Sequence, residues 1–118
     1  MSGITIACPC GRCRIALTGQ PILAAECHCT SCRQAAEGLE SLPGAPHERS
    51  PTGGVPYVLW RKDRVGPITG AGHLADRRLG PQSTTRRIIA TCCNAPMFLE
   101  FKGGHWLSIH AARWPATQ

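Results

Sequence analysis

The eight cysteines of this chain fall into short clusters. In chain order the main clusters are Cys8-Pro9-Cys10, Cys27-His28-Cys29-Thr30-Ser31-Cys32 and Cys92-Cys93. Residues two apart in a strand have Cα atoms about 6.6 Å apart, at the outer limit for a disulfide, and adjacent residues, about 3.8 Å apart, are too close for a relaxed bridge. The spacing therefore favours metal ligation, and long-range disulfides in a secreted chain are the alternative.

The N-terminal residues 1–7 contain neither a basic region nor an apolar run long enough for a signal peptide or a membrane span. We therefore expect a cytoplasmic protein that neither spans nor binds a membrane. In a reducing cytosol, clustered cysteines are metal ligands or catalytic thiols rather than disulfides. The length of 118 residues fits one domain, residues 1–118, whose modest core a bound metal would reinforce.

Short apolar stretches separated by Gly, Pro and Asp predict a mainly β fold with one short helix. A first strand should precede a tight turn at residues 8–11, and the other predicted strands are 13–17, 22–27, 55–60, 65–69, 73–79, 85–91, 97–102 and 106–110. The helix is predicted over residues 33–37, because Ser31 and Gln34 have capping-box spacing and Gly38 should stop it. The breaker-rich segment 41–54 is predicted to be an exposed loop.

The middle cluster has the spacing of a zinc site with an open position. On an extended approach Cys27 and Cys29 point to one face of the chain and His28 to the other, so His28 is not expected to be a ligand. A turn after Cys29 can bring Cys32 back to the same point, where amides at a helix start favour thiolates. Three protein ligands leave a fourth zinc position for water or substrate, as in catalytic sites. Buried structural thiols are the alternative.

The first cluster, Cys8 and Cys10, needs partners from elsewhere in the chain to close a tetrahedron. Cys93 is the predicted partner, and Cys92 joins if the chain turns sharply there; otherwise Cys13, a histidine or water completes the site. Cys13 is interpreted as an ordinary core residue. A closed site would contribute on the order of 10 kcal/mol to folding. The sequence thus predicts up to two zinc ions per chain.

The formal net charge of +6 comes from eleven Arg and two Lys against seven acidic residues. Arginine makes bidentate contacts with carboxylates and phosphates, so an Arg-rich face suits an acidic ligand or a nucleic-acid backbone. A solvated surface explains the same composition. With one Tyr and two Phe, the chain has few aromatic side chains on which bases could stack, which disfavours nucleic acid.

The cysteine clusters resemble those of the glutathione-dependent formaldehyde-activating enzyme (GFA) family, which carries C-x-C-G, then C-H-C-x-x-C, then C-x-x-C-G-x-P-hydrophobic. The first two motifs stand here as Cys8-Pro9-Cys10-Gly11 and Cys27-His28-Cys29-Thr30-Ser31-Cys32-Arg33. The third motif of this chain differs from the family's C-x-x-C-G-x-P-hydrophobic pattern. When Pro96-Met97-Phe98 is aligned with the family's Pro-Leu-Phe, Cys93 falls on the second cysteine, Ala90 stands where the first belongs, and Asn94 stands where Gly is usual.

The resemblance implies a β-tent of small antiparallel sheets stapled by zinc. It implies that Cys27, Cys29 and Cys32 hold the catalytic zinc, whereas Cys8 and Cys10 supply half of a structural site. The implied activity is that of a carbon–sulfur lyase that adds glutathione, or a related thiol, to formaldehyde or a similar small aldehyde. Candidates for binding the carboxylates of the tripeptide are Arg33, Arg61, Arg86 and Arg87.

Two other functions fit the same residues. One is a non-enzymatic zinc-binding module that recognises a protein or nucleic acid through an Arg-rich face. The other is a redox sensor, in which exposed thiols oxidise reversibly and zinc is lost. Binding of glutathione that is insensitive to salt would favour the enzyme, and steeply salt-dependent binding of DNA or RNA would favour the module.

Overall fold

Two antiparallel sheets and one α-helix make up the part of the chain that the structure, a computed structural model, describes: residues 3–47, 49–77 and 84–114. The smaller sheet has the strand order β1-β2-β5 and the larger one β3-β4-β9-β8-β7-β6. The strands are β1 (Gly3–Ala7), β2 (Arg14–Thr18), β3 (Leu23–Cys27), β4 (Val55–Arg61), β5 (Val65–Thr69), β6 (Leu74–Asp76), β7 (Thr85–Ala90), β8 (Ala95–Phe101) and β9 (Trp106–His110). The helices are α1 (Thr30–Glu40) and the 3-10 turns η1 (Lys62–Arg64), η2 (Ala71–His73) and η3 (Ala111–Arg113).

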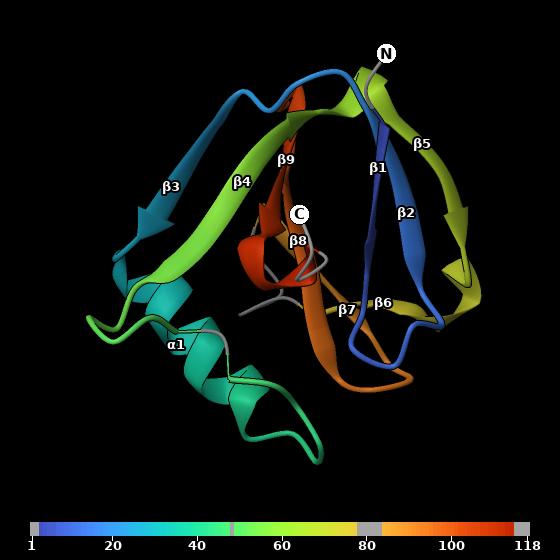
Figure 1. Ribbon diagram of the computed structural model, residues 1–118. Coiled ribbons are helices and arrows are strands. Elements are labelled where there is room, and N and C mark those ends of the chain that lie inside the picture. Colours follow the sequence, from blue (N-terminus) through green and yellow to red (C-terminus); the bar gives the residue numbers. More distant parts are fainter. Residues whose placement is uncertain (1–2, 48, 78–83, 115–118) are drawn as a thin grey trace.

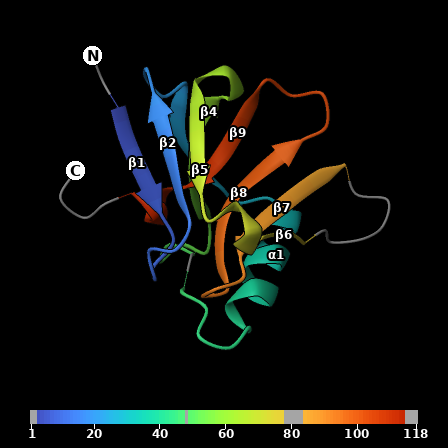
Figure 2. The ribbon, with the colours of Figure 1, turned by 90° about the vertical axis from the view of Figure 1, so that its right-hand side faces the viewer.

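The two sheets lean together like the sides of a tent. In Figure 1, β3 and β4 on one side and β1, β2 and β5 on the other approach each other at the top and spread apart below, with α1 under β3 and β4. Figure 2, turned by 90°, shows β7, β8 and β9 running obliquely to β1 and β2. The predicted mainly β fold with antiparallel sheets and one helix is therefore confirmed.

The main core lies between the sheets. Ile15 and Leu17 alternate with more exposed residues along β2, as a strand with one buried face requires. They pack with Ile6 of β1 in one cluster that also contains Met97 and Ile109 of the larger sheet. Each such side chain is almost fully buried, and burying one contributes about 1.5–3 kcal/mol.

A second, smaller core lies under α1. Ala36 and Cys32 of the helix pack against Val55 and Tyr57 of β4 and Leu99 of β8. Small side chains on the buried face of the helix let it approach the sheet closely. This packing holds Cys32, one of the predicted zinc ligands, against the larger sheet.

The helix is longer than predicted. It begins after Cys29, whose side chain accepts a hydrogen bond from the Cys32 backbone N–H, so a thiol caps the helix instead of Ser31. Gly38 was expected to end the helix, but it does not adopt the left-handed conformation of a helix-ending glycine, and the helix continues to Glu40. The Ser41 hydroxyl then donates to the carbonyl of Gly38.

The strand predicted over residues 73–79 is also different. Residues 71–73 form the turn η2, whose His73 N–H donates to the Gly70 carbonyl, and the strand covers Leu74–Asp76. Gly70 has φ +77°, and a side chain there would collide with the carbonyl oxygen of Arg12, so only glycine fits this turn. Residues 78 and 79 lie outside the described part. The segment 41–54, apart from residue 48, contains no strand and no helix, as predicted.

Candidate metal centres

Three cysteine sulfurs meet where β3 runs into α1. Cys27 ends the strand, Cys29 caps the helix and Cys32 lies in its first turn. The Sγ atoms of Cys27 and Cys29 are 3.3 Å apart, and all three sulfurs lie within 4.8 Å of one another. Two sulfurs bound to one tetrahedral zinc at about 2.3 Å would be about 3.8 Å apart, so this three-cysteine cluster fits zinc.

The thiols of the three-cysteine cluster differ in acidity. Hydrogen bonds with the Ser31 hydroxyl and the Cys32 backbone N–H lower the pKa of Cys29 to about 6. Burial, together with hydrogen bonds to Cys27 and Cys29, raises the pKa of Cys32 to about 12. A divalent cation would let all three thiols ionise together, which is why a metal suits this group of side chains.

His28 turns away from the three sulfurs, as the strand geometry predicts. Its Nε2 lies 2.8 Å from Oε2 of Glu26. The same carboxylate accepts hydrogen bonds from the hydroxyls of Ser50, at 2.9 Å, and Thr52, at 2.7 Å, and those two bonds are the main reason that the pKa of Glu26 is lowered. These contacts fasten the end of the long loop to β3, beside the three-cysteine cluster.

Four cysteine sulfurs meet at a second place, between two turns that are far apart in the sequence. Cys8 and Cys10 come from the turn between β1 and β2, and Cys92 and Cys93 from the turn between β7 and β8. The Sγ atoms are 3.5 Å apart for Cys8 and Cys10, 3.7 Å for Cys8 and Cys92, and 3.3 Å for Cys10 and Cys92. This four-cysteine cluster also fits a tetrahedral zinc.

Both late cysteines reach the four-cysteine cluster because they lie in a turn. In a strand, neighbouring side chains point to opposite sides. Here the Cys93 N–H donates to the Ala90 carbonyl, and Asn94 adopts φ +53°, so the chain reverses within residues 91–94. The sharp turn that would bring in Cys92 is therefore present. Cys13 is buried in the core, with its thiol donating to the Gly70 carbonyl, in agreement with its interpretation as a core residue.

The surroundings of Cys8 favour its thiolate. Burial acts to raise the pKa of Cys8, but hydrogen bonds from the Cys13 backbone N–H and from the neighbouring thiols outweigh it and lower that pKa to about 6. Burial raises the pKa of Cys92, and its hydrogen bonds with Cys10 and Cys8 do the same. A cation would again relieve the repulsion that keeps these thiols from ionising together.

A buried polar group stands behind the three-cysteine cluster. The hydroxyl of Tyr57 interacts with the Cys32 thiol and with Arg87, and its ring packs edge-on against His110 at 4.9 Å between ring centres. Tyr57, Arg87 and His110 are all buried. Sequence reasoning missed Tyr57. Its place follows from the pairing of β3 with β4, in which Tyr57 lies opposite Ala25, and single-sequence patterns do not give that register.

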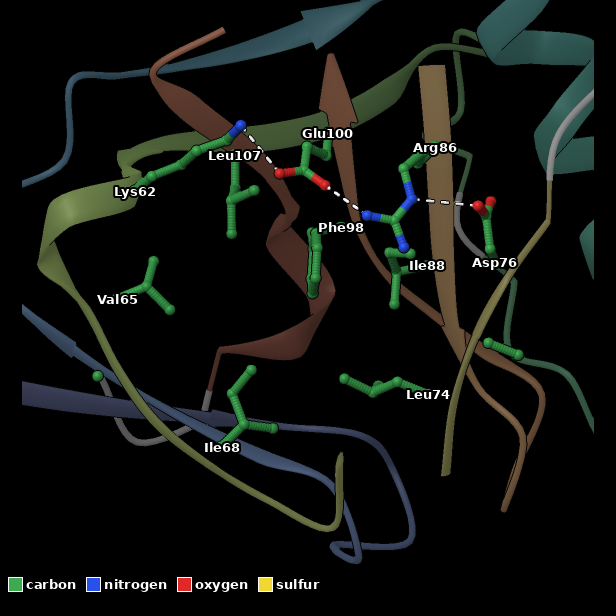
Figure 3. A pocket seen from close by; sticks show the side chains of 12 residues that line it. Lys62, Val65, Ile68, Leu74, Asp76, Arg86, Ile88, Phe98, Glu100 and Leu107 are labelled. Carbon is green, nitrogen blue, oxygen red and sulfur yellow. Dashed lines mark hydrogen bonds and ion pairs between the residues drawn. The ribbon is translucent and has the colours of Figure 1, made fainter. Parts of the chain in front are cut away.

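The four candidate arginines lie in different places. Arg87 lines a small hollow together with Cys32 and also a neighbouring cavity of about 230 Å³ beside α1. Arg33 is exposed on α1, directly after Cys32. Arg61 is exposed and pairs with Asp63, and Arg86 pairs with two carboxylates in another cavity (Figure 3). The structure therefore places Arg87 beside Cys32, whereas Arg33 follows Cys32 at an exposed position of α1. Arg61 and Arg86 line neither the hollow at Cys32 nor the cavity beside α1.

The fold and the two clusters define a class: a small, mainly β protein with two groups of cysteine thiols, each able to hold a metal ion. The sequence profile of the family called glutathione-dependent formaldehyde-activating enzyme matches residues 3–109, and the chain belongs to this GFA family. A search of curated proteins finds no match.

A crystal structure of a Rhodobacter sphaeroides protein has a similar fold. Its TM-score is 0.65 at 17% sequence identity, and the alignment covers 98% of this chain and 91% of that one. At this identity the likeness concerns the fold alone. No helix in the described residues is long and apolar enough to cross a membrane.

Proposed function

We propose that this chain is a zinc-dependent carbon–sulfur lyase of GFA type, which adds glutathione or a related thiol to formaldehyde or a similar small aldehyde. The observation that carries the proposal is the convergence of Cys27, Cys29 and Cys32. Three protein sulfurs leave one position of a tetrahedral metal open, and the exposure of Cys29 leaves that side of the cluster accessible. We further propose that residues 1–118 act as one cytoplasmic domain.

The cysteines of the three-cysteine cluster would hold the zinc, and the hydrogen bonds of Cys29 keep its thiol ready to bind as thiolate. When bound, zinc would stabilise the thiolate form of the incoming thiol, which is the nucleophile. The Tyr57 hydroxyl, in contact with Cys32, would orient that sulfur and moderate its electron donation, as hydrogen-bond partners of metal ligands commonly do. The four-cysteine cluster would hold the second, structural zinc.

The reaction is an addition without oxidation or reduction. The sulfur of the thiol forms a bond to the carbonyl carbon, the carbonyl π electrons move to oxygen, and the proton lost by the thiol ends on that oxygen. The product is a hemithioacetal, which carries an S-hydroxymethyl group when the aldehyde is formaldehyde. The reverse reaction breaks the same carbon–sulfur bond, which is the lyase direction.

Arg87 is the best placed of the candidate arginines to bind a carboxylate of the thiol. Its side chain is 7% exposed and contacts the Tyr57 hydroxyl, and the structure gives it no carboxylate partner among the described residues. A buried guanidinium without an anion is costly, so a ligand carboxylate would complete it. The adjoining cavity also contains Arg77, and none of the described residues that line it is acidic. Arg33, Arg61 and Arg86 remain weaker candidates.

The test compares Cys29→Ser with Cys93→Ser. Serine keeps the size of the side chain, and at position 29 it is a good helix cap, so α1 should persist. We expect two zinc ions per chain in the parent and one in each variant, measured by metal analysis. Turnover of thiol and formaldehyde, measured by NMR exchange above the uncatalysed rate, should be lost in Cys29→Ser.

The matched substitution for the carboxylate site is Arg87→Gln against Arg64→Gln, which changes an exposed arginine on η1. Arg87→Gln should raise KM for glutathione about tenfold or more, the cost of one charge-assisted contact, and should affect cysteamine, a thiol without carboxylates, much less. Arg64→Gln should change neither. If the parent with both zinc ions turns over no thiol, the proposal is wrong.

The non-enzymatic module finds less support in the structure. Tyr57 and Trp60 are buried and so cannot stack on bases. Arg49, Arg61 and Arg86 each pair with a carboxylate, which lowers the positive charge that the surface offers to a phosphate backbone. DNA or RNA binding that weakens steeply with salt would revive this alternative.

A further inference from the structure

The chain from Cys27 to Cys29 carries two of the three sulfurs of the three-cysteine cluster. Cys27 is held by its pairing with Val55 of β4, and Cys29 by the hydrogen bond that caps α1. His28, between them, belongs to neither a strand nor a helix. The spacing of these two sulfurs therefore depends on what holds His28.

On the back of this segment, Glu26 and His28 meet at one oxygen atom. Oε2 of Glu26 lies 2.8 Å from Nε2 of His28. The same oxygen accepts hydrogen bonds from the Ser50 hydroxyl at 2.9 Å and from the Thr52 hydroxyl at 2.7 Å. Because side chains alternate along an extended chain, these contacts lie on the side opposite the Cys27 sulfur. They tie the residues on both sides of Cys27 to the loop that precedes β4.

The two hydroxyls are held in place by the loop itself. The Ser50 N–H donates to the Gly54 carbonyl at 2.8 Å, which closes a turn over residues 50–54. Arg49, one residue earlier, is fastened to the end of α1, since its Nε and Nη2 lie 3.1 and 2.8 Å from Oε1 of Glu40. In Figure 1 the loop returns from the far end of α1 to β4 and passes the end of β3. The hydroxyl donors are therefore preorganised.

Gly54 allows the loop to approach Glu26 and His28 closely. A Cβ atom at this buried position would lie 2.6 Å from Oε2 of Glu26 and 2.6 Å from Cε1 of His28, closer than Cβ atoms approach other atoms in proteins. A side chain here would therefore displace both side chains. Gly54 directly precedes Val55, which pairs with Cys27, so the loop and the strand pairing meet at one of the zinc ligands.

We propose that the contacts of Glu26 with His28, Ser50 and Thr52 form a clamp, which sets the spacing of the first two sulfurs of the three-cysteine cluster and thereby its affinity for zinc. By holding the backbone at His28, the clamp reduces the conformational entropy that the two cysteines lose when they bind a metal. Its members act through the backbone and are positioning residues. The inference rests on the proposed zinc site but not on the proposed thiol chemistry.

The test measures the zinc affinity of each cluster. The zinc-loaded protein is titrated with a chelator of known affinity, and backbone amide NMR shifts of α1 and of β1 and β8 identify the cluster that releases zinc. Glu26→Ala, and separately Ser50→Ala combined with Thr52→Val, should raise the Kd of the three-cysteine cluster about tenfold or more, as is typical for the outer partners of a metal site. The Kd of the four-cysteine cluster should not change. Ser41→Ala removes a hydroxyl contact at the other end of the loop and should change neither Kd.

Glu26→Gln distinguishes the clamp from the charge of the carboxylate. Glutamine keeps an oxygen that can accept the same hydrogen bonds but carries no charge, so the Kd should stay within about threefold of that of the parent. With Co²⁺ in place of zinc, the d–d bands of the three-cysteine cluster should change in Glu26→Ala and remain as in the parent in Glu26→Gln. If both variants weaken zinc equally, Glu26 acts through its charge, and the proposal is wrong.

Hydrogen exchange of the zinc-loaded variants separates positioning from loop stability. Amide shifts of β1 and β8 should match those of the parent, which shows that the fold is retained. Faster exchange over residues 50–54 with an unchanged Kd would show that the clamp only orders the loop, and would overturn this inference alone. A parent whose three-cysteine cluster holds no zinc would overturn both this inference and the proposed function.

Discussion

Cys29 combines two roles at the start of α1. Its sulfur accepts the Cys32 backbone N–H, as an N-cap does, and it also lies in the three-cysteine cluster. The positive end of the helix dipole favours a thiolate at this position. A cysteine spacing that suits a metal therefore also begins the helix, which is why the capping-box pattern of Ser31 and Gln34 misplaced the helix start.

Asn94 shows how one residue shapes the turn of the four-cysteine cluster. It adopts φ +53°, and its side-chain amide donates to the Pro43 carbonyl at 2.8 Å. Asn94→Ala should lower the free energy of unfolding by about 2 kcal/mol, because both the left-handed backbone and the lost hydrogen bond count against it. Asn94→Gly loses only the hydrogen bond and should cost about 1 kcal/mol. Urea unfolding of the zinc-loaded proteins measures both.

The order of the two variants is the informative result. The GFA pattern has glycine at this place, so a backbone requirement predicts that glycine is tolerated better than alanine. Equal losses for the two variants would contradict the left-handed conformation and would assign the whole effect to the contact with Pro43.

Glu100 gives the protein a predictable response to acid. Its hydrogen bond and ion pair with Lys62, with a further contribution from Arg86, lower the pKa of this carboxyl in the folded state. A lowered folded-state pKa means that the stabilisation is complete above the unfolded value, about 4.3, and is lost as the pH falls through the folded value. Glu100→Gln should therefore cost about 1 kcal/mol near pH 7 and progressively less below about pH 4.

Chemical unfolding of Glu100→Gln and the parent at several pH values measures this difference. Glu37→Gln, at an exposed position on α1, is the control and should follow the parent at every pH. A loss for Glu100→Gln that does not change between pH 7 and pH 3 would show that the carboxyl acts through packing and not through its charge.

At the scale of elements, α1 carries a glycine where a helix former would be more stable. Gly38 lies within the helix, and a methyl group added there meets no atom within 4 Å. Gly38→Ala should therefore raise the free energy of unfolding by about 0.5–1 kcal/mol. Gly38 also lines the 230 Å³ cavity that contains Arg87, so the methyl group should narrow the cavity and raise KM for glutathione.

The neighbouring Glu37→Ala separates the two effects of Gly38→Ala. It also places alanine in the helix, but at a position that does not line the cavity. We expect a small change in stability and an unchanged KM, from thermal unfolding and steady-state kinetics. If Gly38→Ala destabilises the protein, the helix does not continue through this residue as described.

The elements themselves were largely predictable from the sequence, but their pairing was not. Strands such as β5 and β9 follow from local apolar patterns and breakers, which are local properties. The start of β6 was predicted one residue too early, because the turn at Gly70 depends on a close contact with Arg12, far away in the sequence. Tyr57 and Arg87 reach Cys32 only through strand register and helix packing.

For the whole molecule, the four-cysteine cluster joins the two sheets at their turns. Cys8 follows β1 in the smaller sheet, and Cys92 follows β7 in the larger one, 84 positions later. The cysteine spacing predicted such a long-range connection, and Cys92 joined because the local turn differs from a strand. The three-cysteine cluster, in contrast, spans only residues 27–32 and connects β3 to α1.

This difference in span predicts different consequences of losing each metal. Closing a loop of this length in the unfolded chain is worth about 4–5 kcal/mol, whereas a loop of a few residues restricts the unfolded chain far less. Cys93→Ser should therefore lower the unfolding free energy of the zinc-loaded protein by several kcal/mol, and Cys29→Ser by about 1–2 kcal/mol. In excess chelator the free energy of unfolding of the parent should fall to that of zinc-loaded Cys93→Ser or below it. Both clusters then lose their zinc, and with it the stabilisation that zinc binding gives the native state.

Guanidinium unfolding with zinc and with chelator measures these four states. The slope of the transition should stay similar for Cys29→Ser, since the sheets remain packed, and hydrogen exchange of β1 and β8 should speed up only in Cys93→Ser. If chelator leaves the unfolding midpoint of the parent unchanged, the core around Ile6, Ile15 and Met97 alone holds the two sheets together. The four-cysteine cluster then does not stabilise the packing of the sheets.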